Sequence, residues 1–186
     1  LFDGKKGIKI IPCYYKKDYP EWSDRGDGPG APVASHLPNS PVIQTGKRDG
    51  SKIRLPNGNY LEETASYYVL VETKAGGMTP ALITMKSTQL NVSKKWNSMM
   101  KTIQIPDGKG GFAIPPMHGV VYNMQSVLQK NDKGSWYGWS VSQDRIMGQA
   151  DTSLYLSAKD FRGNVSKGNV QTKADVEEKA KDNTPY

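Results

Sequence analysis

The stretch that decides the fold is LEETASYYVLVETKAGGMTPALITMKSTQLNVSKKWNSMMKTI, residues 61–103. Residues 61–74 end in a run of β-branched and aromatic side chains, which favours a β-strand. The glycine pair at 76–77 predicts a turn, and residues 80–87 read as the returning strand. The stretch therefore begins as two antiparallel strands.

An amphipathic helix follows these two strands. Val92, Trp96 and Ile103 recur at helical spacing, whereas Lys94 and Lys95 fall elsewhere on the helix. A helix of this kind buries one stripe and exposes a basic side. We therefore expect Trp96 to belong to the core, although its lysine neighbours, together with Lys101, make the helix a candidate basic contact surface.

The rest of the chain supplies further elements around this strand–strand–helix unit. The patterns predict strands over 7–15, 42–45, 118–129 and 135–142, a long loop over 18–41, and a helix over 151–165. This order predicts a mainly β fold with two helices, an OB-fold-like five-stranded antiparallel barrel with one helix between strands 3 and 4 and a second at the C-terminus. A β-sandwich with two peripheral helices is the alternative. Residues 1–166 would form this domain, and 167–186 a polar, flexible tail.

Composition narrows the class of partner. The 186 residues include 25 Lys and Arg and 18 Asp and Glu, which gives a net charge of +7. The 19 Gly and 12 Pro argue against a long helical bundle, and 4 Trp with 10 Tyr argue against disorder. No stretch is apolar for long enough to cross a membrane. Basic charge favours an anionic partner, most commonly nucleic acid, although a basic soluble protein without such a partner remains an alternative.

The sequence offers no recognisable catalytic frame. Cys13 is the only cysteine, so an intrachain disulfide and a cysteine zinc cluster are excluded, and its apolar surroundings predict a buried thiol. Phosphate-loop, zinc-protease and serine-hydrolase motifs are absent. Asp18, Glu21, Asp24 and Asp27 are spaced three apart and could hold a divalent cation, but solvated charge is the simpler interpretation. We therefore expect no enzyme, cofactor or metal, and an intracellular, reducing compartment.

Aromatic and basic residues interleave between residues 14 and 26. Single-stranded nucleic acid is bound by such sets, because bases stack on flat rings and cations follow the phosphates. In the competing interpretation, alternate rings of this segment face the core. Strand alternation predicts that either Tyr14 or Tyr15 faces the core. The candidate contacts in this segment are Tyr15, Lys16, Lys17, Tyr19, Trp22 and Arg25.

A second aromatic and basic segment spans residues 130–139. Residues 131–134 predict a hairpin turn, and Trp136 lies on the opposite strand face from Tyr137. In an OB-fold the loop between the last two strands borders the ligand groove. The candidate contacts here are Lys130, Lys133 and Trp136, with ordinary core packing as the alternative for the ring.

Three blocks of the sequence resemble a family of small bacteriophage proteins, some of which are similar to phage single-stranded DNA-binding proteins of OB-fold type. The blocks are IPCYY (11–15) with EW (21–22) and RG (25–26), MKSTQL (85–90) with SKKWN (93–97), and NDKGSWYGW (131–139). The resemblance implies non-catalytic binding of single-stranded DNA in phage replication or recombination, in the host cytoplasm, and adds Lys86 to the candidate contacts.

Other functions stay open at this stage. A phage virion structural or assembly protein would also suit a β-rich body with long loops, and a nuclease using Asp18 to Asp27 is a third hypothesis. The end of the chain, residues 174–186, carries several acids and closes on Pro185-Tyr186. Such tails recruit replication or recombination enzymes in many single-strand-binding proteins, although an ordinary flexible end is the alternative. A homo-oligomer is compatible with the sequence.

Overall fold

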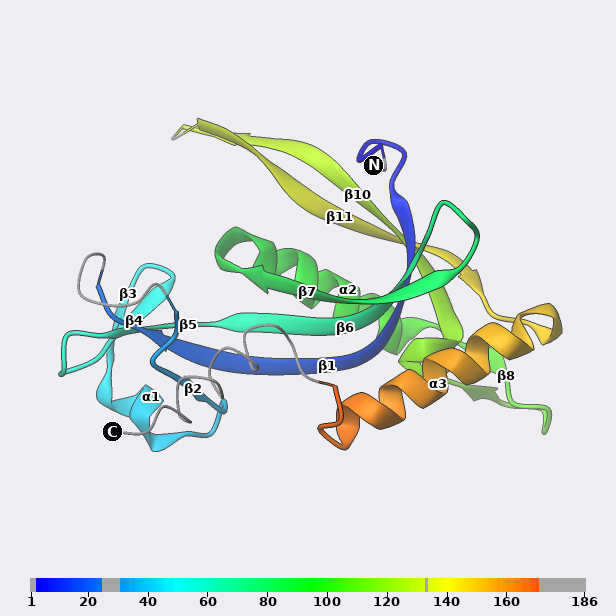
Figure 1. Ribbon diagram of the computed structural model, residues 1–186, viewed down its shortest axis with the longest axis horizontal. Coiled ribbons are helices and arrows are strands. Elements are labelled where there is room, and N and C mark those ends of the chain that lie inside the picture. The colour runs from blue at the N-terminus through cyan, green and yellow to red at the C-terminus, as the bar shows by residue number, and fades with distance from the viewer. Residues whose placement is uncertain (1–2, 25–30, 133, 171–186) are drawn as a thin grey trace, which may run out of the picture.

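The chain folds around one long, strongly curved strand, β1 (Ile8–Trp22), which runs through most of the molecule (Figure 1). The computed structural model describes residues 3–24, 31–132 and 134–170. The other strands are β2 (Ala34–His36), β3 (Lys47–Asp49), β4 (Lys52–Arg54), β5 (Tyr60–Glu62), β6 (Thr64–Glu72), β7 (Met78–Lys86), β8 (Ile105–Pro106), β9 (Phe112–Ala113), β10 (Val120–Asn131) and β11 (Gly134–Ile146). The α-helices are α1 (Pro41–Thr45), α2 (Leu90–Thr102) and α3 (Thr152–Ser166), and short 3-10 turns cover Ser87–Gln89, Met117–Gly119 and Gln149–Asp151.

The main sheet is antiparallel, with its long strands in the order β7–β6–β1–β10–β11. β1 pairs with β10 near Ile8 and with β6 from Ile10 to Asp18. Its register with β6 shifts between Pro12 and Tyr14. Since proline has no N–H to donate to the ladder, an irregularity is favoured at Pro12, and a bulge there bends the strand.

This bend curls the sheet into a half-barrel. Within the described residues, β7 and β11 do not pair with each other, and α2 contacts both of these edge strands. The mainly β fold with two long helices is confirmed, but the sheet is open where the sequence predicted a five-stranded barrel. The described residues also contain additional short strands between β1 and β6.

The concave face of the half-barrel holds the larger core, under α2. Ile10, Tyr67, Trp96 and Tyr122 are all fully buried there. The Trp96 ring stacks on Tyr67 with centroids 4.3 Å apart and meets Tyr122 edge-on at 5.6 Å. The prediction that Trp96 belongs to the core is therefore confirmed.

The convex face carries a second core under α3, on the other side of β1 from α2 (Figure 1). Ala158 of α3 packs there with Ile11, Cys13, Leu70 and Val121. Cys13 is buried as predicted, and burial raises the pKa of its thiol to about 12. The thiol is therefore protonated at neutral pH and is an ordinary core side chain.

The predicted long loop over 18–41 is wrong for two of its segments, because β1 continues to Trp22 and β2 pairs with it. The predicted strand over 42–45 is also wrong. Pro41 begins the helix α1, since its fixed φ suits a first helical position. β2 and α1 belong to an insertion between β1 and β6, residues 23–63. Its Ile53, Leu55 and Leu61 form a small core with Tyr19 of β1.

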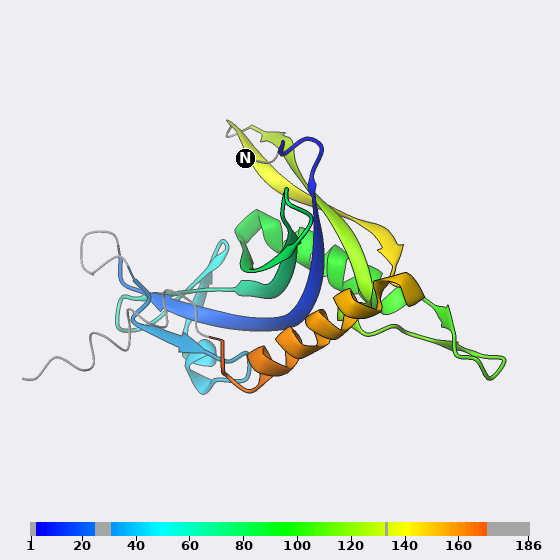
Figure 2. The same cartoon turned by 45° about the vertical axis from the view of Figure 1, so that its right-hand side comes forward.

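A two-stranded ribbon, β8–β9, projects away from the rest of the protein (Figure 2). Its Phe112 side chain is 72% exposed, and Ile114 beside it is 60% exposed. Among the described residues, no helix has the length and apolar character needed to cross a membrane.

Candidate functional site

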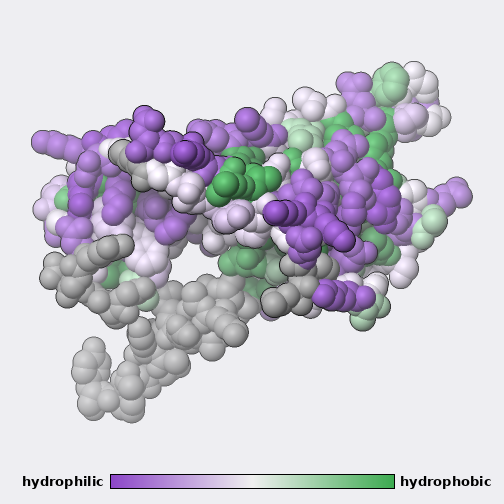
Figure 3. All heavy atoms as spheres, turned by 90° about the horizontal axis from the view of Figure 1, so that it is seen from above, coloured by the Kyte–Doolittle hydropathy of each residue, from purple (hydrophilic) through white to green (hydrophobic). Residues whose placement is uncertain are grey.

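The β10–β11 hairpin presents a row of exposed side chains on one face. Leu128 is paired directly with Tyr137, and Lys130 and Trp139 occupy neighbouring positions on the same face. Leu128, Tyr137 and Trp139 are 64%, 67% and 40% exposed. We call Leu128, Lys130, Tyr137 and Trp139 the hairpin ladder. Figure 3, which looks from the hairpin side, shows apolar patches between mainly hydrophilic side chains.

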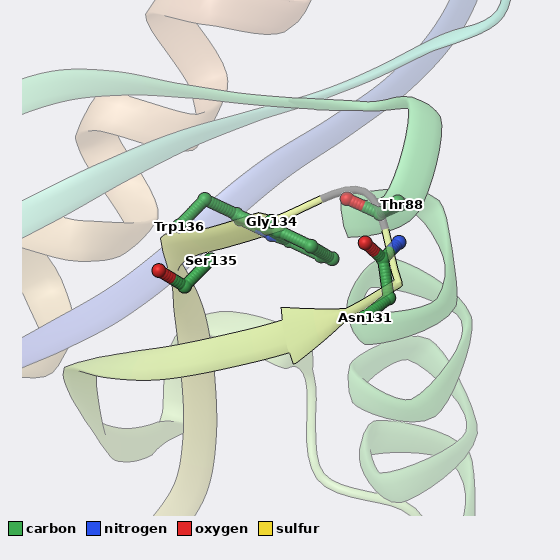
Figure 4. A pocket seen from close by; sticks show the side chains of 5 residues that line it. All are labelled: Thr88, Asn131, Gly134, Ser135 and Trp136. Atoms are coloured by element: carbon green, nitrogen blue, oxygen red, sulfur yellow. The ribbon is translucent and has the colours of Figure 1, made fainter.

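The opposite face of the hairpin lies against the start of α2. A pocket of about 290 Å³ opens there, with the half-buried Trp136 ring along one side (Figure 4). The indole N–H of Trp136 is buried and has no hydrogen-bond partner among the described residues. The residues that line this junction pocket are Thr88, Asn131, Gly134, Ser135 and Trp136.

One side chain fixes the hairpin to the helix start. The backbone N–H of Trp139 donates to the Oε1 atom of Gln89 over 3.0 Å. A Cβ at position 138 would run into the Gln89 amide and would lie 2.8 Å from that of Gln129, so a larger residue there would displace the ends of these two side chains. Ser87, two residues before Gln89, is the only non-glycine residue with positive φ among the described residues (51°). The backbone of this junction is therefore held in a constrained conformation.

A second aromatic and basic surface lies on the insertion. Direct pairing places Lys47, Arg54, Tyr60 and Trp22 in one row across β3, β4, β5 and β1. Lys52 Nζ lies 3.6 Å from the centroid of the Tyr60 ring, and Lys86 Nζ lies 5.7 Å from that of Trp22. We call this surface the insertion face: Trp22, Lys47, Lys52, Arg54, Tyr60 and Lys86.

Two cations of the insertion face are held by carboxylates. Arg54 pairs with Asp24 at 2.7 Å, and this hydrogen bond raises the pKa of the guanidinium. Lys86 pairs with Glu62 at 2.9 Å. Exposed ion pairs of this kind are weak because water and salt screen them, so an arriving phosphate can exchange with the carboxylate. Lys47 makes no ion pair with any residue the structure describes.

Comparison with known protein families identifies the family of this chain. The family model described as Pam3 phage gp34-like protein matches residues 1–171. The chain belongs to this family. This gp34-like chain is therefore a phage protein, as the resemblance of its three sequence blocks implied. No curated protein and no solved structure matches it.

The gp34-like chain brings some predicted contacts into these two surfaces. Trp22 and Lys86 meet on the insertion face, although they come from different sequence blocks. Lys130 lies on the hairpin ladder and Trp136 lines the junction pocket. Predicted contacts Arg25 and Lys133 lie outside the described residues.

The other predicted contacts on β1 lie outside these two surfaces. Tyr15 packs on Tyr67 of the main core, with ring centroids 4.9 Å apart. Tyr19 is not in a loop, and its ring is buried in the core of the insertion, where it has no surface for a base to stack on. Lys16 pairs with Asp18 at 3.1 Å, and Lys17 pairs with Glu63 at 2.7 Å, a hydrogen bond that raises the pKa of Lys17.

The acidic cluster of the first segment holds the insertion together. The buried Glu21 carboxylate accepts hydrogen bonds from Asn59 at 2.6 Å and Asn57 at 3.1 Å, and contacts His36 at 2.7 Å. These hydrogen bonds, that from Asn59 first, lower the pKa of Glu21. Asp27 lies outside the described residues. The expectation of solvated charge is wrong for Asp18 and Glu21, which are both buried.

Sequence reasoning missed four residues of the insertion face, and did not choose Tyr137 or Trp139 on the hairpin. The four are Lys47, Lys52, Arg54 and Tyr60. Asp49-Gly50 is a hairpin signal that predicts the β3–β4 turn and would have paired the two basic strands. For the hairpin, alternation alone separated the two faces correctly, but it gave no indication of which face α2 covers.

Proposed function

We propose that this phage protein binds single-stranded DNA without catalysis, with the hairpin ladder and the insertion face as its two contact surfaces. Each combines exposed or half-buried rings with cations, the combination that binds single strands by stacking and phosphate contacts. In phage replication or recombination, such binding would take place in the host cytoplasm.

The observation that carries the proposal is where these surfaces lie in the strand order. β1 pairs with both β6 and β10, β6 with β7, and β10 with β11, while α2 falls between β7 and β10 in sequence. This order resembles that of an OB-fold with its last contact left open, which supports the proposal. OB-folds bind oligonucleotides with the loops between strands 1 and 2 and between strands 4 and 5. The insertion and the hairpin occupy these two connections, and both extend toward the same side of the molecule (Figures 1 and 2).

The test is binding of fluorescently labelled oligo(dT), followed by anisotropy, to the full chain and to single-ring variants. Tyr137→Ala and Tyr60→Ala each remove one ring. Losing one base stack weakens binding by about 1–3 kcal/mol, which is roughly a 5- to 150-fold rise in Kd. Phe112→Ala is the matched control, since it removes an equally exposed ring from the β8–β9 ribbon. No binding by the wild type, or an equal loss in the Phe112 variant, would contradict the proposal.

A second candidate function has one observation in its favour. The β8–β9 ribbon projects from the body with Phe112 and Ile114 exposed, as an arm that packs on a neighbouring subunit would. A phage virion structural or assembly role would use it. Finding the protein as a stoichiometric component of purified particles supports this second function, and its absence from them removes it.

A further inference from the structure

We propose that the junction pocket binds one unpaired nucleobase of the bound strand, stacked on Trp136 with its edge toward Thr88 and Asn131. This inference rests on the proposed function, and adds to it that one position of the DNA is read by base identity. The hairpin ladder and the insertion face bind any sequence, because every base has a flat face and every nucleotide a phosphate.

The size of the pocket suits a single base. Its volume of about 290 Å³ lies just below the range of ligand pockets for drug-sized molecules, roughly 300–1,000 Å³, as a smaller ligand requires. Gly134 lines it without a side chain, and a Cβ built on Gly134 would meet nothing within 4 Å. A flat ring fits between the hairpin and the start of α2, where Figure 4 shows the Trp136 indole extending toward Thr88 and Asn131.

The side chains around the ring have the chemistry that reads base edges. Thr88 carries a hydroxyl that donates and accepts, and Asn131 carries an amide with both functions. Proteins recognise unstacked bases in single strands through such groups, while an aromatic side chain stacks on the base face.

The pocket is also held in shape before any ligand arrives. The hydrogen bond from Trp139 N–H to Gln89 joins the hairpin to the residue that follows Thr88. Ser87, with φ of 51°, sets the direction of the chain into Thr88. Such strained backbone persists where the surrounding structure determines it, and it clusters at binding sites. A preformed pocket lowers the entropic cost of fixing the base.

The test compares oligo(dT), oligo(dC) and oligo(dA) on the full chain and on two variants. The wild type should prefer its best homopolymer by about fivefold or more over its worst, since good edge contacts discriminate by roughly 1–3 kcal/mol. The double variant Thr88→Val with Asn131→Ala should bring the three affinities within about twofold of one another while the salt dependence stays unchanged. Lys130→Gln is the control, and should weaken all three affinities equally, with a shallower salt slope.

A second readout locates the base directly. Irradiation of the complex with an oligonucleotide containing 5-iododeoxyuridine should crosslink Trp136, identified by mass spectrometry of the digested protein. Equal wild-type affinities for the three homopolymers, or a double variant that keeps the preference, would overturn the pocket while leaving DNA binding intact. Crosslinks that all fall outside the residues lining the pocket would do the same. A wild type that binds none of the strands would overturn both proposals.

Discussion

Replacing Gly138 by Ala tests whether the hairpin is locked to the start of α2. The added methyl group would run into the Gln89 side chain and would lie 2.8 Å from the amide group of Gln129. Contacts under 3.0 Å force something to move. Because these atoms are the flexible ends of side chains, the Gln89 amide should swing aside, and the hydrogen bond from the Trp139 N–H should weaken or break.

The expected cost follows from these two contacts. The ends of the two glutamine side chains can move at little cost, so the main loss is the hydrogen bond to Gln89, about 1 kcal/mol. The free energy of unfolding should thus fall by about 1 kcal/mol. Affinity for oligo(dT) should also fall, although no proposed contact residue is altered, because the hairpin ladder and the junction pocket both depend on the position of the hairpin.

Chemical denaturation of the variant measures the first effect, and hydrogen exchange of the Trp139 amide the second. Gly148→Ala is the matched control. Its backbone φ of −113° suits any residue and a Cβ there meets nothing within 4 Å. It should change stability by less than about 0.5 kcal/mol. A Gly138→Ala protein with wild-type stability and an equally protected Trp139 amide would refute the reasoning.

Three further predictions concern the cores. Trp96→Ala should lower the free energy of unfolding by about 3–5 kcal/mol in denaturant titrations, because Trp96 is fully buried between two rings; a loss below about 1 kcal/mol would contradict this. Burial first, then Arg162 and Lys159, hold the pKa of His118 below its usual value. As the pH falls, His118 is therefore protonated in the unfolded chain before it is protonated in the folded protein, so stability should decline below about pH 6.5. A His118→Leu variant should lose that decline, as measured by thermal melts at several pH values. Glu21→Ala should cost about 1–3 kcal/mol, read from the denaturation midpoint, because Asn57 and Asn59 lose their acceptor; an unchanged midpoint would show that the carboxylate does not hold the insertion.

The elements that could be predicted from the sequence are those whose pattern and packing agree. β6 alternates, and its two faces meet different cores, with Tyr67 under α2 and Leu70 under α3. The residues of α2 repeat at helical spacing because one stripe plugs the half-barrel. These local signals are strong because burial of each face selects its residues.

The insertion was not predictable in the same way. Pro20 and Asp18 are poor strand formers, yet β1 continues through them because β2 and β6 supply partners. Val42 and Ile43 favour a strand by propensity, yet they form a helix that packs on Leu55 and its neighbours. In each case tertiary contacts override the local preference.

The candidate site depended on which face of each strand is covered. The sequence identified the aromatic and basic segments, but Tyr19 was drawn into a core that only the insertion creates. Conversely, Tyr60 lies beside Trp22 on the insertion face because β5 pairs with β1 across a long separation in sequence. Such neighbours follow from the topology, which no single segment encodes.

The most direct test of the central claim is the binding constant for oligo(dT), measured by anisotropy over a series of salt concentrations. The two basic, aromatic surfaces predict tight binding at low salt. They also predict a linear fall of log K with log salt, with a slope of about −0.7 for each phosphate contacted. No binding at low salt, or an affinity that does not change with salt, would contradict the account.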